Sequence, residues 1–259
     1  MAPAGLGRSE NDQKLSPGAA EMQEYRIGSV VDLLARLKEL DSFQMFRGQA
    51  RADWSLVPAI GRMHDVVGQY GGWHLLEQVL LERFQKYSRS FIAREPDNKL
   101  EWLVVAQHYG LPTRLLDWTT NPLKALFFTV ENPGLAEEGI LWALEPKEWW
   151  SQLTDIDRRL DESGTLVAYS PDYLNQRVSN QESCFCVFPF PDDHSEILPL
   201  DRGKMYEPHI RRLAKFIVPA NCKANVCQEL QKLGITHRSM FPGLDGLAKS
   251  IRREMGLTW

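Results

Sequence analysis

The stretch "AQHYGLPTRLLDWTTNP", from Ala106 to Pro122, places two charged residues in a run that otherwise suits a protein interior. Arg114 and Asp117 stand beside two leucines and Trp118. Burying an unpaired charge costs several kcal/mol or more, so buried charges are normally paired. The stretch therefore predicts that Arg114 and Asp117 satisfy each other, or the nearby backbone, around a tight turn.

The same stretch also offers groups that bind ligands. The hydroxyls of Thr113 and Thr119 and the imidazole of His108 are able to hydrogen-bond a sugar or a carboxamide. Spacing alone leaves the structural and the binding interpretation open and favours the structural one. A combined interpretation assigns Arg114, Asp117 and Trp118 to holding the turn, while Thr119 and His108 are what the turn presents.

The composition is that of an ordinary globular protein. The chain has 259 residues, of which 43% are hydrophobic and 25% are charged, enough for one large or two modest domains. A formal net charge of −4 argues against a dedicated duplex-binding protein, which usually carries a basic surplus. The sequence lacks the usual phosphate-binding, dinucleotide-binding, zinc-protease and serine-hydrolase motifs, so those classes lose their support.

The four cysteines, Cys184, Cys186, Cys222 and Cys227, are too few for a disulfide scaffold. Their spacing matches no usual zinc motif, so no metal is expected. No apolar run reaches the roughly 20 residues that span a bilayer, and the N-terminal residues lack the basic segment and apolar stretch of a secretory signal. These features predict a soluble, cytoplasmic protein without a membrane partner.

The pattern of apolar residues predicts a disordered leader over residues 1–22 and a single folded domain over 23–259. Helices are expected behind an N-cap at Ser29 and behind the pair Asn121–Pro122, and Gly234 suits the C-terminal cap of another. The predicted helices cover 29–40, 73–92, 99–109, 121–132, 223–234 and 244–254, and the predicted strands cover 43–48, 139–146, 164–171, 184–191 and 214–220. This order predicts an α+β fold: a small mixed or antiparallel sheet, an inserted helical segment and C-terminal helices.

Two further stretches suggest chemistry. In "FRGQ", Arg47 ends a predicted strand beside Gly48, where a ligand is able to approach the backbone, so Arg47 is a candidate phosphate anchor. The alternative is an edge-strand arginine that reaches water. In "NQRVSNQESCFCVFP", Arg177, Gln181 and Glu182 precede a strand. An amide or carboxylate there suits ribose hydroxyls, and a carboxylate also stabilises positive charge at an anomeric carbon, although such residues are usually ordinary loop.

Together with the tail "LGITHRSMFPGLDGLAKSIR", these blocks resemble the FRG domain family, which is named for its Phe-Arg-Gly motif. The resemblance runs from about residue 27 to 253. FRG proteins resemble distant relatives of ADP-ribosyltransferases and occur in bacteria and phages with toxin–antitoxin and phage-defence systems. The resemblance implies a sheet core like that of ADP-ribosyltransferases, NAD as substrate, a nucleic-acid or protein acceptor, and an antitoxin or other partner protein.

The resemblance also assigns roles to residues. Arg47 and Gly48 would hold the NAD phosphates, Thr119 and then Thr120 would support the nicotinamide ribose, and Gln181 or Glu182 would act at the anomeric carbon. His108 and Arg114 would either help to bind NAD or only hold the turn, with Asp117, Trp118 and Arg177 as structural support.

The family tends to have glutamine, two or three residues, and then Gly-x-Phe, whereas this chain has "QESCF" from Gln181. Which of Gln181 and Glu182 is functional stays open, and so does a non-catalytic role in binding a nucleotide, nucleic acid or protein.

Overall fold

The computed structural model describes residues 22–257, apart from 93, 135, 151–159, 161–163 and 172–179. Its described strands form one eight-stranded sheet in the order β1-β8-β4-β2-β3-β7-β6-β5. Neighbouring strands are antiparallel except for the parallel pairs β1–β8 and β5–β6. The strands are β1 (Gln23–Arg26), β2 (Met45–Gln49), β3 (Leu115–Thr119), β4 (Gly139–Pro146), β5 (Trp149–Trp150), β6 (Val167–Tyr169), β7 (Ser183–Val187) and β8 (Ile210–Val218). The predicted α+β class is confirmed.

The helices begin and end close to the predicted positions, because local capping groups fix them. Ser29 accepts the backbone N–H of Asp32, Asn121 accepts those of Leu123 and Lys124, and Gly234 has a φ of +80° after its helix. The helices are α1 (Val30–Glu39), α2 (His64–Val67), α3 (Trp73–Ser88), α4 (Lys99–His108), α5 (Pro122–Val130), α8 (Lys223–Lys232), α9 (His237–Met240) and α10 (Leu244–Glu254). The predicted apolar link over 236–243 contains α9. Within the described part of the chain, no helix is both long and apolar enough to cross a membrane.

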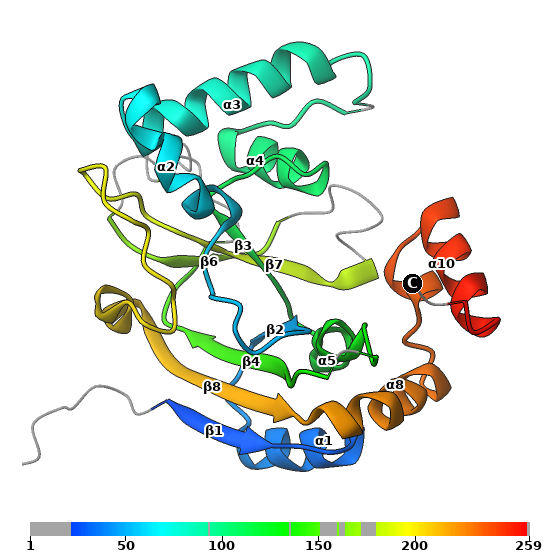
Figure 1. Ribbon diagram of the computed structural model, residues 1–259. Coiled ribbons are helices and arrows are strands. Elements are labelled where there is room, and N and C mark those ends of the chain that lie inside the picture. Colours follow the sequence, from blue (N-terminus) through cyan, green and yellow to red (C-terminus); the bar gives the residue numbers. More distant parts are fainter. Residues whose placement is uncertain are drawn as a thin grey trace, which may run out of the picture.

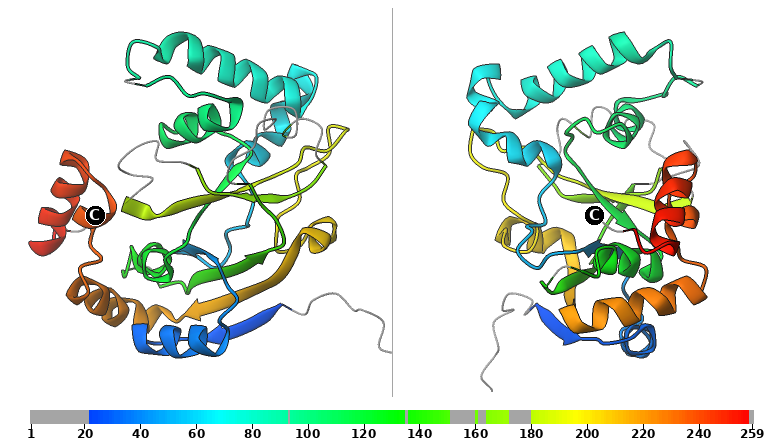
Figure 2. Two further views of the ribbon diagram at one scale, coloured as in Figure 1. Left: turned by 180° about the vertical axis from the view of Figure 1, so that it is seen from behind. Right: turned by 45° about the vertical axis from the view of Figure 1, so that its right-hand side comes forward.

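The sheet is divided where β2 meets β3, since these strands pair only at Phe46 and Thr119. Figure 1 shows β3, β7 and β6 in one layer and β2, β4, β8 and β1 in another. A shared apolar core joins Met45 and Trp142 of one layer to Leu116 and Cys186 of the other. Helices α3 and α4 lie over the first layer, and α1, α5 and α8 lie over the second, as both views of Figure 2 show.

The predicted pairing of Arg114 with Asp117 is wrong. Residues 115–119 form β3, in register with β7, rather than a turn. Arg114 directly precedes this strand and is buried, whereas Asp117 within it is exposed, so the two side chains lie in different surroundings. Arg114 is 1% exposed, and its Nε and Nη2 donate to the two carboxylate oxygens of Glu77 on α3 at 2.9 and 2.6 Å. The expected buried ion pair exists, but its acid is Glu77.

Gly48 is required by packing between β2 and α5. A Cβ at this position would lie 1.9 Å from the carbonyl oxygen of Ala125 and 2.7 Å from the backbone nitrogen of Thr129. The space that a side chain would occupy is therefore filled by α5. In the Phe-Arg-Gly sequence, Gly48 therefore packs against a helix, directly after the arginine.

Candidate functional site

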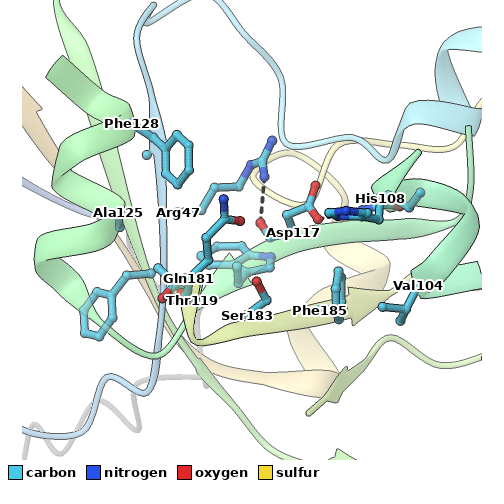
Figure 3. Close-up of a pocket in the computed structure, with 14 residues that line it drawn as sticks. Arg47, Val104, His108, Asp117, Thr119, Ala125, Phe128, Gln181, Ser183 and Phe185 are labelled. Carbon is cyan, nitrogen blue, oxygen red and sulfur yellow. Dashed lines mark hydrogen bonds between the residues drawn. The ribbon is translucent and has the colours of Figure 1, made fainter. Parts of the chain in front are cut away.

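A pocket of about 250 Å³ opens where β2 and β3 separate. Its walls come from β2, β3, β7, the last residues of α4, and α5, as Figure 3 shows. The lining residues are Phe46, Arg47, Gly48, Val104, Gln107, His108, Asp117, Trp118, Thr119, Ala125, Phe128, Gln181, Ser183 and Phe185. The three stretches that the sequence singled out therefore meet at one cavity.

Arg47 spans the gap between the two layers. Its Nη1 donates to the backbone carbonyl of Asp117 at 2.6 Å (Figure 3), while its buried Nε has no hydrogen-bond partner. Burial lowers the pKa of the Arg47 guanidinium, and the carboxylate of Asp117 offsets part of this effect. The indole Nε1 of Trp118, also at the pocket, is a second buried donor without a partner. Unpaired buried donors are costly, so they mark the places where ligand oxygens bind best.

Asp117 is exposed and contributes the only carboxylate among the described residues that line this pocket. Its Oδ1 accepts a hydrogen bond from Nε2 of Gln107 at 2.8 Å. The hydroxyl of Thr113 in turn donates to Oε1 of Gln107. This chain of contacts fixes the orientation of Asp117. The sequence had assigned Asp117 to structural support of a turn, whereas its side chain faces the cavity.

Gln181 and Glu182, between which the sequence did not decide, point to different places. Gln181 lines the pocket, and its Nε2 donates to the carbonyl of Met240 at 3.2 Å. Glu182 has a φ of +48°, and its carboxylate pairs with Lys124 at 2.7 Å outside the pocket. Burial acts to raise the pKa of the Glu182 carboxyl, but the hydrogen bond and charge of Lys124 bring it below its usual value. Gln181 is thus the residue that faces the cavity.

Thr119 lines the pocket, but its hydroxyl already makes two hydrogen bonds. It donates to the carbonyl of Gln181 at 2.6 Å and accepts from the backbone N–H of Asn121 at 3.1 Å. The hydroxyl therefore ties β3 to the start of β7 and to the N-terminus of α5. Thr120 is exposed, lies outside the lining, and donates its backbone N–H to the carbonyl of Glu182 at 3.1 Å.

The predicted residues thus divide into three groups. Arg47, Gly48, His108, Asp117, Trp118, Thr119 and Gln181 line the pocket. Arg114, Thr120 and Glu182 do not, and Arg177 lies outside the described residues. Sequence reasoning missed Gln107 and Ser183, although both belong to the quoted stretches. The described residues contain no group of three or more His, Cys, Asp or Glu side chains placed to hold a metal ion.

Comparison with known families agrees with the resemblance seen in the sequence. Residues 42–138 match the model of the FRG domain, which supports the resemblance to the FRG domain family. The stretches around Gln181 and at the C-terminus lie outside the matched range. No curated protein and no solved structure matches the chain. The likeness to ADP-ribosyltransferases, the NAD substrate and the acceptor therefore remain predictions.

Proposed function

We propose that this protein binds NAD in the Arg47 pocket and transfers ADP-ribose to a nucleic-acid or protein acceptor. The observation that carries the proposal is the arrangement of Arg47, whose Nε is an unpaired buried donor, in one cavity with Asp117 and Gln181. A guanidinium with an unused N–H suits a phosphate oxygen of the dinucleotide. The rings of Phe46, Phe128 and Phe185 give the same cavity apolar surface suited to a flat base.

The reaction breaks the bond between the ribose anomeric carbon and the nicotinamide nitrogen, and the electron pair leaves with nicotinamide. Positive charge develops on the ribose until the acceptor nucleophile forms a bond to the anomeric carbon and loses its proton. Asp117, held by Gln107, would stabilise that developing charge. Gln181 would orient ribose hydroxyls without opposing the charge, and Arg47 would hold a phosphate whose charge does not change.

The test is incubation with NAD labelled in its adenylate part, with and without a cell lysate, while released nicotinamide and labelled acceptor are both measured. Wild-type protein is expected to release nicotinamide. Asp117→Asn is expected to lower the rate by about 100-fold, because an oriented charge at the reacting centre is lost. Glu182→Gln is the matched acidic control and should keep most activity. Correctly folded wild-type protein that neither releases nicotinamide nor labels an acceptor would overturn the proposal.

A second candidate function is nucleotide binding without turnover. It is favoured by the ion pair that holds Glu182 on Lys124 and by the fully engaged hydroxyl of Thr119. In that case NAD at about 100 times its dissociation constant should stabilise the protein by roughly 2.7 kcal/mol, with no nicotinamide released. Thermal melts with and without NAD, read beside the nicotinamide assay, separate the two functions.

A further inference from the structure

A second cavity, of about 330 Å³, lies among α5, α8, α9 and α10. Figure 1 shows α10 standing beside α5 and above α8 at the edge of the molecule. Phe127 and Ile235 give this cavity an apolar wall, and His237 and Arg253 give it polar groups. None of its lining residues belongs to the Arg47 pocket.

Arg253 brings a positive charge to the cavity, and none of the groups that accept its hydrogen bonds is a carboxylate. Its Nη1 donates to the carbonyl of Glu131 at 3.1 Å and to Nε2 of His237 at 3.2 Å, and its Nη2 donates to the sulfur of Cys227 at 2.7 Å. All three acceptors are neutral. Within the described ranges, no carboxylate lies at ion-pair distance from this guanidinium. Among the described residues that line the cavity, Glu254 is the only acid, and it makes no ion pair with Arg253.

His237 adds an unused donor beside that charge. An arginine always donates, so the contact with Arg253 makes Nε2 of His237 an acceptor, and in a neutral ring the proton is then on Nδ1. The residue is 8% exposed, and Nδ1 has no hydrogen-bond partner. Oε1 of Glu131 lies 3.9 Å from Nδ1, beyond hydrogen-bond distance. Burial and the charges of Arg253 and Lys249 lower the pKa of His237 to about 4, which keeps the ring neutral at pH 7.

We propose that this second cavity binds a small organic monocarboxylate. Its oxygens accept hydrogen bonds from Arg253 and from Nδ1–H of His237, and its apolar part packs against Phe127 and Ile235. One guanidinium is balanced by one negative charge. Glu254, which lies at the cavity and accepts from the hydroxyl of Ser250 at 3.1 Å, opposes a dianion.

The cavity is connected to the Arg47 pocket through one short helix. Helix α9 carries His237 at one end and Met240 at the other, and the carbonyl of Met240 accepts the hydrogen bond from Gln181. A ligand held against His237 therefore changes the surroundings of the Gln181 side-chain amide. This connection does not depend on the proposed transfer of ADP-ribose.

The test is a titration of ¹⁵N-labelled protein with acetate, butyrate and benzoate, followed by NMR of the His237 ring and of the Gln181 side-chain amide. At least one of the three is expected to shift both sets of signals saturably. Succinate and inorganic phosphate should bind at least about tenfold more weakly, because the second negative charge of succinate and of the phosphate dianion is repelled by Glu254. The ring of His237 should carry its proton on Nδ1 before any addition.

Arg253→Gln is expected to abolish the saturable shift, and Arg253→Lys, which keeps the charge but loses the planar fork, to weaken it about tenfold. Arg252→Gln is the matched control, because it removes the same charge from α10 outside the cavity lining. The proposal is overturned if no monocarboxylate gives a saturable shift of the NMR signals, or if the shift is unchanged in Arg253→Gln. It is also overturned if inorganic phosphate binds as tightly as the best monocarboxylate. Failure of NAD to bind at Arg47 would leave all of these outcomes unchanged.

Discussion

The guanidinium groups of Arg114 and Arg47 have opposite hydrogen-bonding environments, although both residues come from stretches that suggested a function in the sequence. Arg114 is buried, and its guanidinium donates two hydrogen bonds to the carboxylate of Glu77. Its Nη1 also donates to the carbonyl of Leu160 at 3.0 Å, and the guanidinium lies over the ring of Phe190. Arg47 makes one hydrogen bond to a backbone carbonyl and keeps an unpaired N–H at a cavity. An arginine with its donors satisfied holds the fold, whereas one with an unused donor at a cavity is available to a ligand.

The largest loss of stability is expected when the ion pair between Arg114 and Glu77 is broken. Glu77→Gln removes the buried carboxylate that accepts hydrogen bonds from Nε and Nη2 of Arg114, which should cost about 3–5 kcal/mol of unfolding free energy. Equilibrium urea denaturation measures this loss. Glu82→Gln, a change of the same type on the exposed side of α3, should stay within about 0.5 kcal/mol. A loss below about 1 kcal/mol in Glu77→Gln would mean that the pair does not hold the fold.

At the second cavity, burial and then the charge of Arg253 keep His237 neutral. The pKa of His237 falls to about 4 in the folded protein, against about 6.5 in an unfolded chain. Between these values the unfolded state binds the extra proton, so stability should rise with pH from about 4 to 6.5 and level off above. The total gain is up to about 3 kcal/mol.

Urea denaturation at several pH values, on wild type and His237→Phe, measures this dependence. The variant should have a flatter profile in this window, since its ring cannot take up the proton. Identical pH profiles for the two proteins would show that His237 does not titrate as described.

A substitution of Arg47 is expected to lower the unfolding free energy by a smaller amount. Arg47→Gln removes one hydrogen bond to the carbonyl of Asp117, worth about 1–2 kcal/mol, and no ion pair within the described residues. Thermal and urea unfolding of this variant should show a folded protein less affected than Glu77→Gln. A loss as large as that of Glu77→Gln would place Arg47 with Arg114 as a structural residue.

The smallest effect is expected at Asp117. Because Asp117 is exposed and is not the partner of Arg114, Asp117→Asn should change the unfolding free energy by less than about 1 kcal/mol. The pairing expected from the sequence alone implies about 3 kcal/mol or more for the same change. Chemical denaturation of this single variant distinguishes the two arrangements.

Local sequence signals predict helices and strands, but they do not predict contacts between residues that lie far apart in the chain. Ser29, Asn121 and Gly234 act on their own helices, so the sequence placed those helix ends well. The strand β3 was mistaken for a turn because its apolar residues face both sides, which hides the alternation of a half-buried strand. Glu77 lies 37 residues before Arg114, so no local pattern joins them.

The site was predictable in part for the same reason. Arg47, His108, Thr119 and Gln181 were expected together because each stands in a distinctive stretch, and the structure brings them to one cavity. The choice between Gln181 and Glu182 depends on a positive φ at Glu182 and on Lys124, which packs from another element. Neither feature is visible in the order of residues alone.

The most direct test of the central claim is isothermal titration calorimetry of NAD with wild type, Arg47→Gln and Arg51→Gln. Arg51 is the matched control, because it pairs with Asp53 and does not line the pocket. Wild type and Arg51→Gln are expected to bind one NAD with similar affinity, and Arg47→Gln is expected to bind at least about tenfold more weakly, since a charged hydrogen bond to phosphate is lost. Equal binding by wild type and Arg47→Gln, or no binding by folded wild type, would contradict the claim that the Arg47 pocket is an NAD site.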